Sequence, residues 1–292
     1  MESIANTKKR SSKNSPWALS WKRLCRDKKA MTGLVIVVIL VLCALFPATI
    51  APEGFDEQNY ADALQWPSSK HWLGTDQYGR DILSRIIWGA RTSIVVGFIS
   101  VGISAVVGSI LGAVAAFYGK RVDNLIMRAL DIIMAIPSTL LAISIAAALG
   151  SGLFNLMVAV GIGAIPTYAR IVRGSVMTVS EQEYIEAARA GGASDFRIIV
   201  RHIFPNVLAP MIVQATMGIA GAILNCAALS FIGLGIQPPT PEWGSMLSTG
   251  KQFLLNDWYV AVFPGLAIMI TILALNLLGD GLRDALDPRM KK

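Results

Sequence analysis

Residues 181–206 read EQEYIEAARAGGASDFRIIVRHIFPN, and this polar stretch stands between two apolar runs, 154–176 and 207–236. Each run is long enough to cross the roughly 30 Å hydrocarbon core of a bilayer, which takes about 20 residues of α-helix. The polar stretch therefore connects two predicted membrane spans and lies in water on one side of the membrane.

The rest of the chain has the composition of a membrane protein. Of its 292 residues, 54% are hydrophobic and 15% are charged, whereas soluble domains are about 25% charged. Further runs with little or no charge predict spans at 30–52, 92–118, about 125–149 and 259–278. The sequence therefore predicts an all-α membrane protein with six transmembrane helices.

Local signals set the ends and bends of these spans. The first run is too long for the apolar part of a secretory signal peptide, and no A-x-A cleavage site follows it. We expect Pro137 to kink the third span, Gly150-Ser151-Gly152 to separate it from the fourth, and Gly279-Asp280 to end the sixth. Gly108 and Gly112 form a small-xxx-small pair that would let another helix approach closely, with loose glycine packing as the alternative.

The basic residues orient the chain, because six spans place both termini on the same side. Only five of the 26 lysines and arginines fall on the opposite side: Lys70, Arg80, Arg85, Arg91 and Lys251. Since lysine and arginine collect in cytoplasmic loops, we expect the arm 1–29, the loop 177–206 and the tail 280–292 to be cytoplasmic. The net charge of +7 is then an orientation signal and gives no reason to expect nucleic acid as a partner.

The segment 53–91 faces outward in this topology. After Gly79, apolar residues at helical spacing predict an interfacial helix that leads into the second span: Ile82, Leu83, Ile86, Ile87 and Ala90. Asp81 and Arg85 are four apart and can form an ion pair. His71 favours a loop or capping role over a metal site, and three scattered cysteines suggest neither a disulfide nor zinc.

The polar stretch 181–206 predicts a hairpin of two short helices. Ser180 and Glu183 match a capping box, which indicates a helix from Glu181 to about Ala190, and Gly191-Gly192 supplies a turn. Ser194 can cap a second helix, which Pro205 would end at the membrane surface. Its expected apolar face contains Phe196, Ile199, Val200 and Ile203.

This hairpin has two other interpretations, a DNA-binding helix-turn-helix and an amphipathic loop resting on the bilayer. Membrane spans tie both of its ends, and its few basic residues are interleaved with acids, which argues against DNA. Very small side chains gather at its turn and suit close contact with another protein better than lipid anchoring: Ala187, Ala188, Ala190, Gly191 and Gly192.

The spacing of Glu186-Ala187-Ala188, Gly192 and Pro205 resembles the EAA loop of permease subunits of ATP-binding-cassette importers. His202 and Phe204 stand where that pattern usually has Ile and Leu. Three further stretches resemble the dipeptide, oligopeptide and nickel branch, in particular its C-type permease with an extra N-terminal span. They are HWLGTDQYGRDILSR at 71–85, RHIFPN at 201–206, and LSFIGLG at 229–235 followed by Pro238-Pro239 and Glu242-Trp243-Gly244.

The resemblance implies a type I importer permease fold, with 30–52 as the extra span and 92–279 as a five-helix core. It implies that the coupling loop 177–206 docks a separate ATPase through Glu186, Ala187, Ala188, Gly191, Gly192 and Pro205. The implied partners are a B-type permease, two ATPase subunits, and an extracytoplasmic solute-binding protein that meets segments 53–91 and 237–258. The implied solute is a di- or oligopeptide, with nickel or another small solute as the alternative.

We expect no catalytic residue, metal site or cofactor in this chain, since it contains no G-x-x-x-x-G-K-[ST] run. ATP and magnesium would bind to the partner ATPases. Arg128 and Asp131, three apart near the cytoplasmic end of the third span, favour a structural ion pair.

Uncharged polar residues in the last two spans are candidates for the solute path, or simply for bonds between helices: Gln214, Asn225 and Asn276. An ion-coupled secondary transporter, the main rival class, would be expected to carry an acidic residue at mid-membrane, and none is evident. An intramembrane enzyme is disfavoured because the spans show no nucleophile and base pair.

Overall fold

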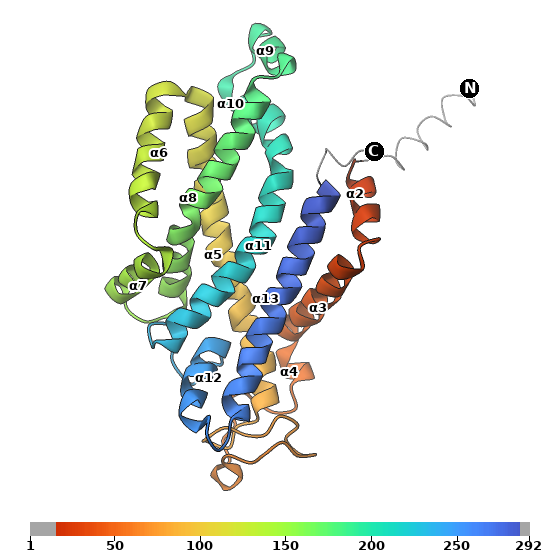
Figure 1. The fold of residues 1–292 in the computed structure, drawn as a ribbon, viewed down its shortest axis with the longest axis vertical. Coiled ribbons are helices and arrows are strands. Elements are labelled where there is room, and N and C mark those ends of the chain that lie inside the picture. The colour runs from red at the N-terminus through yellow and green to blue at the C-terminus, as the bar shows by residue number, and fades with distance from the viewer. Residues whose placement is uncertain (1–15, 287–292) are drawn as a thin grey trace, which may run out of the picture.

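The computed structural model describes residues 16–286, and helices account for most of them (Figure 1). Within these residues, β-structure is limited to one isolated bridge between Thr75 and Asp81. Two 3-10 turns (η1, Tyr60–Asp62; η3, Lys251–Phe253) and one π-helical turn (η2, Ile199–Ile203) accompany the α-helices. The α-helices are α2 (Pro16–Leu24), α3 (Lys28–Leu45), α4 (Pro47–Ile50), α5 (Ile82–Tyr118), α6 (Lys120–Met134), α7 (Ser138–Leu149), α8 (Leu153–Ser180), α9 (Glu183–Ala190), α10 (Asp195–Ile198), α11 (Phe204–Phe231), α12 (Trp243–Gly250) and α13 (Tyr259–Leu286).

Five helices are long and apolar enough to cross a membrane: α3, α5, α8, the continuous helix Asp195–Phe231, and α13. A sixth span is present if α6 and α7, which meet at 85°, count as one broken span. The prediction of an all-α membrane protein is therefore confirmed, and the predicted number of six spans is reached when the broken pair is counted as one. The kink expected at Pro137 is this sharp bend, because proline cannot continue the hydrogen-bond ladder of the preceding helix.

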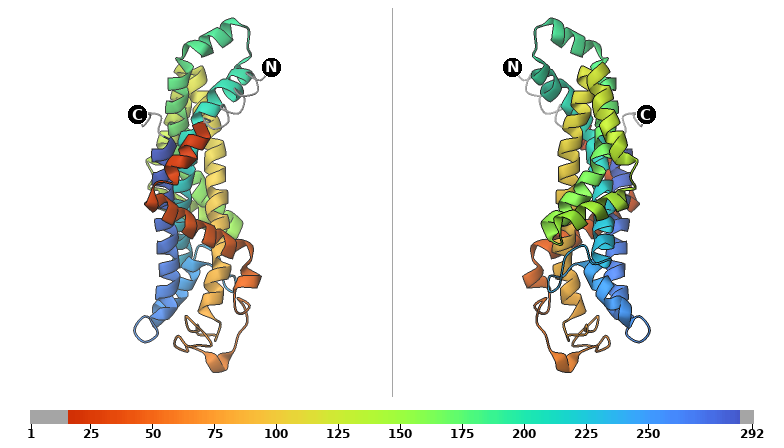
Figure 2. Two further views of the ribbon diagram at one scale, coloured as in Figure 1. Left: turned by 90° about the vertical axis from the view of Figure 1, so that its right-hand side faces the viewer. Right: turned by 90° about the vertical axis from the view of Figure 1, so that its left-hand side faces the viewer.

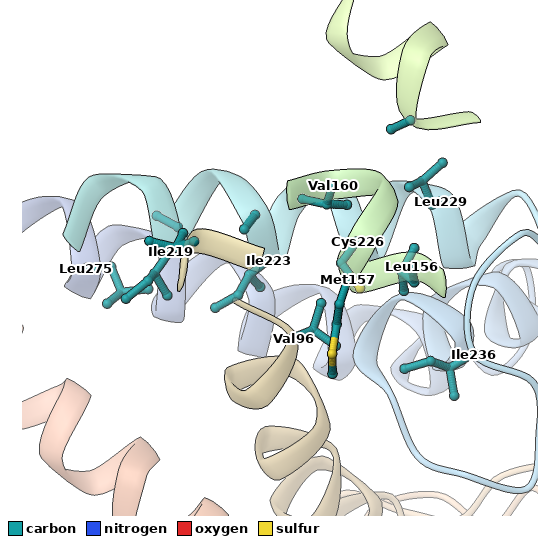
Figure 3. Close-up of a cluster of buried hydrophobic side chains, with 14 of the residues drawn as sticks. Val96, Leu156, Met157, Val160, Ile219, Ile223, Cys226, Leu229, Ile236 and Leu275 are labelled. Carbon is teal, nitrogen blue, oxygen red and sulfur yellow. The ribbon is translucent and has the colours of Figure 1, made fainter. Parts of the chain in front are cut away.

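The spans form one bundle that is elongated along the helices (Figures 1 and 2). The start of α2 and the end of α13 lie toward the end that carries α9, whereas residues 53–81 and α12 lie at the opposite end. Side chains from α5, α8, α11 and α13 meet in the largest buried cluster, shown in Figure 3: Val96, Leu156, Met157, Val160, Ile219, Ile223, Cys226, Leu229 and Leu275.

The Gly108 and Gly112 pair lies where α5 crosses α8, as the small-xxx-small pattern predicts. A Cβ at Gly108 would lie 2.6 Å from Cβ of Tyr168, and one at Gly112 would overlap with the carbonyl oxygen of Ala169. The two backbones approach so closely that there is no room for a side chain at either position.

The first and last spans differ from the sequence prediction. The first was expected over 30–52 but ends at Leu45, because Pro47 begins the separate helix α4. Conversely, α13 continues through Gly279-Asp280 to Leu286. Here the glycines serve packing, since a Cβ at Gly281 would overlap with Ala30 of α3 and one at Gly279 would meet Met217 of α11. Residues 1–15 of the predicted arm and 287–292 of the predicted tail lie outside the described residues.

The helix expected after Gly79 is present, since α5 begins at Ile82 and runs into the second span without a break. Asp81 does not pair with Arg85. Its carboxylate caps α5 by accepting bonds from the backbone N–H and hydroxyl of Ser84. Arg85 instead donates to the carbonyl oxygen of Phe55 at 2.7 Å. The start of α5 is thus covered by the outward segment, and its polar residues are buried rather than interfacial.

Candidate functional site

The hairpin formed by α9 and α10 projects beyond the bundle at one end of the molecule (Figures 1 and 2). Three of its residues are almost fully buried: Ile185 in α9, Ile198 in α10 and Ile203 in η2. They pack with Val172 and Val176 of α8 and with Val207 of α11, and we call these six residues the hairpin cluster. Apolar packing therefore fixes the projecting hairpin to two membrane-spanning helices.

The outer side of the hairpin differs from its predicted apolar face. Phe196 and Val200 were expected to pack inward, but they are 77% and 50% exposed, and Ile198 takes the buried position. A π-helical turn follows α10, so the side chains from Ile199 to Ile203 depart from the constant 3.6-residue period on which the predicted face was based. Large apolar side chains are consequently presented to the surroundings at this end of the protein.

The turn between α9 and α10 has the predicted glycine. Gly192 has φ of +77°, a left-handed conformation that glycine adopts without strain. The backbone N–H of Ala193 donates to the carbonyl of Ala188 at 3.1 Å, and the Ser194 hydroxyl accepts from the N–H of Arg197, which caps α10 as expected.

The capping box at Ser180 and Glu183 is wrong. Ser180 is the last residue of α8, and its hydroxyl is buried without a hydrogen-bond partner in the described part of the chain. Gln182 takes the N-cap position of α9 and makes no side-chain cap bond. Packing of Val176 in the hairpin cluster holds α8 helical up to this point, and tertiary contacts override the local signal.

Pro205 does not end the second helix at the membrane surface. It lies in the first turn of α11, and α10, η2 and α11 form one continuous helix over Asp195–Phe231. The turn before Pro205 is π-helical, with the N–H of Phe204 donating to the carbonyl of Ile199, so the helix continues up to the proline. The hairpin is therefore joined to the fifth predicted span without a flexible link, and that span ends at Phe231 rather than 236.

The structure divides the motif residues into two groups. Glu186, Ala187, Gly191 and Gly192 are exposed, whereas Ala188 is half-buried against the hairpin cluster. Ala188 is therefore small because α9 packs closely on the bundle, while Glu186 and Ala187 lie on the accessible side. Two polar contacts that the sequence did not reveal also tie α9 to the spans, Asn206 Nδ2 to the Tyr184 hydroxyl and the Arg189 guanidinium over the Phe117 ring.

Two ion pairs hold α6 against α8. The Arg173 guanidinium contacts both carboxylate oxygens of Asp123, at 2.6 and 2.7 Å. Asp131 pairs with Arg170 rather than with Arg128, so the predicted Arg128–Asp131 pair is wrong. The true partner is 39 residues away in the chain and becomes adjacent only when α6 packs on α8.

We expect Asp123→Arg to lower the thermal midpoint of the purified protein, because it places two half-buried cations together; charge-assisted hydrogen bonds are worth about 1.5–3 kcal/mol. Combining it with Arg173→Asp should recover at least half of the loss. Thermal unfolding of the single and exchanged variants measures this, and an exchange no more stable than Asp123→Arg alone would contradict a direct pairing.

A cavity of about 300 Å³ lies within the bundle, lined by residues of α5, α7, α8 and α11. Gln214 and Asn225 both line it, in keeping with the pathway prediction, whereas Asn276 does not. Sequence reasoning missed the small hydroxyl residues of the other walls, because serine and threonine are common in membrane helices and carry no distinguishing signal: Ser100, Ser104, Ser138 and Thr167.

Comparison with known protein families shows to which of them this chain belongs. Residues 108–292 match the family described as binding-protein-dependent transport system inner membrane component. The chain belongs to this family. Residues 15–67 of the permease also match the N-terminal TM domain of oligopeptide transport permease C, which covers the first span. The protein is thus a multi-pass inner membrane permease, and such permeases work with an ATPase and a substrate-binding protein.

The permease is similar over nearly its whole length to several named transport proteins. It is 48% identical over 277 residues to a dipeptide transport system permease protein of Alkalihalophilus pseudofirmus, covering 95% of this chain and 91% of that protein. It is 46% identical to a di/tripeptide transport system permease protein of Pseudomonas aeruginosa, covering 95% and 93%. A glutathione transport system permease protein of Escherichia coli is likewise 46% identical, covering 95% and 92%.

Among solved structures, the permease resembles an inward-facing methionine ABC transporter, with a TM-score of 0.56 and 19% identity. The match covers 69% of the permease and 96% of the transporter chain. At this identity the likeness establishes the fold, and it agrees with the type I importer permease fold that the motifs imply.

The end of the permease opposite the hairpin is held by a polar network. His71 is buried, and its Nδ1 lies 3.2 Å from the Asp81 carboxylate, while Arg80 donates to Asp76 at 2.7 Å. The Lys70 ammonium holds the pKa of the Asp62 carboxyl below its usual value. Among residues 16–286 no three His, Cys, Asp or Glu side chains are grouped to hold a metal ion. His71 lies in the loop between η1 and α5, as the sequence predicted, and contacts the N-cap residue of α5.

Proposed function

We propose that the chain is the C-type permease subunit of an importer of di- and oligopeptides, driven by ATP that separate subunits hydrolyse. The observation that carries the proposal is the hairpin: its inner side is buried on α8 and α11, and its outer side presents Glu186, Ala187 and Phe196. The printed names of three relatives, which concern dipeptides, di/tripeptides and glutathione, support the peptide substrate.

In this proposal the ATPase binds the outer side of the hairpin through Glu186, Ala187 and the glycine turn. A displacement of α10 must move α11, because both belong to one helix that runs to Phe231. Gln214 and Asn225 lie on that same helix and line the cavity. The hairpin can thus act as a rigid lever between an ATP-driven movement outside the membrane and the solute path within it.

The remaining subunits follow from the same proposal. A B-type permease would complete the path, two ATPase subunits would bind ATP and magnesium, and a solute-binding protein would dock on segments 53–91 and 237–258. The present chain would hold neither cofactor and would catalyse no reaction. Nickel or another small solute is the second candidate; the printed names of the relatives favour peptides, and the cavity lining contains no charged residue to hold a metal ion.

The test uses the complex that copurifies with this chain, placed in lipid vesicles with ATP on the hairpin side. We expect uptake of labelled alanyl-alanine to require ATP and the binding protein, and to be unchanged when proton and sodium gradients are collapsed. Uptake that follows an ion gradient without ATP would favour the secondary-transporter class and overturn the proposal.

Replacing Gly192 tests the lever. We expect Gly192→Val to lower uptake and stimulated ATPase activity at least tenfold, because a β-branched residue at positive φ is strained by about 1–3 kcal/mol. A Cβ at Gly192 meets no atom within 4 Å, so the effect is conformational rather than steric. Gly192→Asn is the control, since asparagine tolerates this conformation. Equal activity of the two variants would show that the turn does not shape the coupling surface.

A further inference from the structure

The cavity between α5, α7, α8 and α11 is lined by uncharged residues, and those of α11 follow a regular spacing. Four of the lining residues lie on one face of that helix, because they are spaced four, three and four apart: Gln214, Gly218, Gly221 and Asn225. The two amides stand at the ends of this face and the two glycines between them. Because the amides are 11 residues apart, they are separated by about 16 Å along the helix.

Two of the glycines that line the cavity have room for a side chain. A Cβ at Gly221 would meet no atom within 4 Å, and one at Gly163 of α8 would meet only the carbonyl oxygen of Ser138, at 3.8 Å. Gly218 differs, because a Cβ there would overlap with the Tyr168 hydroxyl. Neither helix contact nor backbone conformation therefore requires glycine at 221, although glycine weakens a helix relative to alanine. Glycine at 221 leaves this part of the cavity lining without a side chain.

Most hydroxyl groups around the cavity are already bonded within the protein. Ser100 donates to the carbonyl of Met157, Ser104 to that of Gly161, and Tyr168 to that of Gln214. The side-chain amides of Gln214 and Asn225 form no hydrogen bond with any described residue. Each amide offers a donor and an acceptor, which is the same pair that a peptide bond carries. These two groups are free to bond a solute that crosses the cavity.

We propose that this cavity is the transit site for the solute, and that Asn225 and Gln214 bond the peptide backbone in succession while Gly221 and Gly163 keep the passage wide. An extended dipeptide or tripeptide spans about 7–11 Å, less than the separation of the two amides, so one peptide cannot hold both at full extension. Asn225 lies toward the outward end of α11 and meets the solute first; Gln214 lies nearer the hairpin. Backbone amides are common to all peptides, so such a site admits many side chains.

The inference rests on the proposed function, and its test is uptake of labelled alanyl-alanine by the reconstituted complex. We expect Gly221→Leu to lower uptake at least tenfold while the second permease and the ATPase still copurify in normal amounts. Gly102→Leu is the matched control: Gly102 lies in the middle of α5, is exposed, and its Cβ would meet nothing within 4 Å. Uptake by that variant should stay within twofold of the unsubstituted complex.

Two results would overturn the proposal that Gly221 keeps the passage wide. Normal uptake by Gly221→Leu would show that solute does not pass this face of α11. Loss of the second permease from that variant would show that Gly221 belongs to an interface between subunits. If the unsubstituted complex itself failed to take up the dipeptide with ATP, the proposed function would fail instead, and the two failures are thereby distinguished.

The amides are tested separately. Asn225→Leu and Gln214→Leu are each expected to lower uptake about fivefold and to raise the peptide concentration for half-maximal uptake, with copurification unchanged. Asn225→Gln keeps the donor and acceptor and should retain at least half of the uptake. If Asn225→Leu transports as well as the unsubstituted protein, or if Asn225→Gln is as impaired as Asn225→Leu, the backbone-bonding role is wrong.

Discussion

Replacing Ile185 with aspartate is expected to lower ATP-dependent uptake at least a hundredfold while the spans remain inserted. Ile185 is 1% exposed and packs in the hairpin cluster between α8 and α11. A carboxylate without a partner costs several kcal/mol to bury. An eight-residue helix such as α9 is not stable by itself, so we expect it to leave the bundle. A detached α9 cannot transmit a force from the ATPase to α11.

The conservative control is Ile185→Val, which removes one methylene, costs about 0.5–1.5 kcal/mol, and should keep at least half of the uptake. Limited trypsin digestion gives an independent measurement, because Arg189 and Arg197 flank the turn and should be cut faster once α9 detaches. Faster cutting with normal uptake would contradict the idea that packing in the hairpin cluster carries the coupling.

Much of this hairpin was predictable because its signals are local. The change from apolar to charged residues at both ends placed it outside the membrane. Gly192 and Ser194 act within a few residues of their own position, and both have the predicted turn and capping roles. The spans were predictable for a similar reason, since a bilayer of fixed thickness demands a run of about 20 apolar residues whatever the surrounding structure.

The errors concern residues whose partners are distant in the chain. Asp131 pairs with Arg170 of α8, which the spacing of Arg128 and Asp131 along one helix could not show. Gly279 lies inside α13, where it packs against Met217 of α11, whereas glycine followed by aspartate read locally indicates a helix end. Phe196 is exposed because α10 meets the bundle through Ile198, a contact in the hairpin cluster that spacing along the helix does not show. In each case packing between helices, absent from local sequence patterns, decides the outcome.

Replacing Gly112 with leucine is expected to reduce the amount of assembled permease at least tenfold. A Cβ at this position would overlap with the carbonyl oxygen of Ala169 and lie 3.1 Å from its Cα. These are backbone atoms of α8 and cannot swing aside as a side chain would. Overpacking a well-packed core costs about 1–3 kcal/mol, and the remaining atoms of leucine would force α5 and α8 further apart. This crossing also supports Tyr168, whose position shapes one wall of the cavity.

Gly102→Leu in the same helix serves as the control, since it makes the same change in helix propensity and has no neighbour within 4 Å. The amount of monodisperse protein in gentle detergent and its thermal midpoint measure the difference between the two variants. Gly112→Ala should lie between them, because a single methyl group still overlaps with Ala169 although α8 needs to shift less. Equal yields of all three variants would mean that α5 and α8 do not approach as closely in the membrane. In that case the small-xxx-small pair would be loose packing, the alternative that the sequence left open.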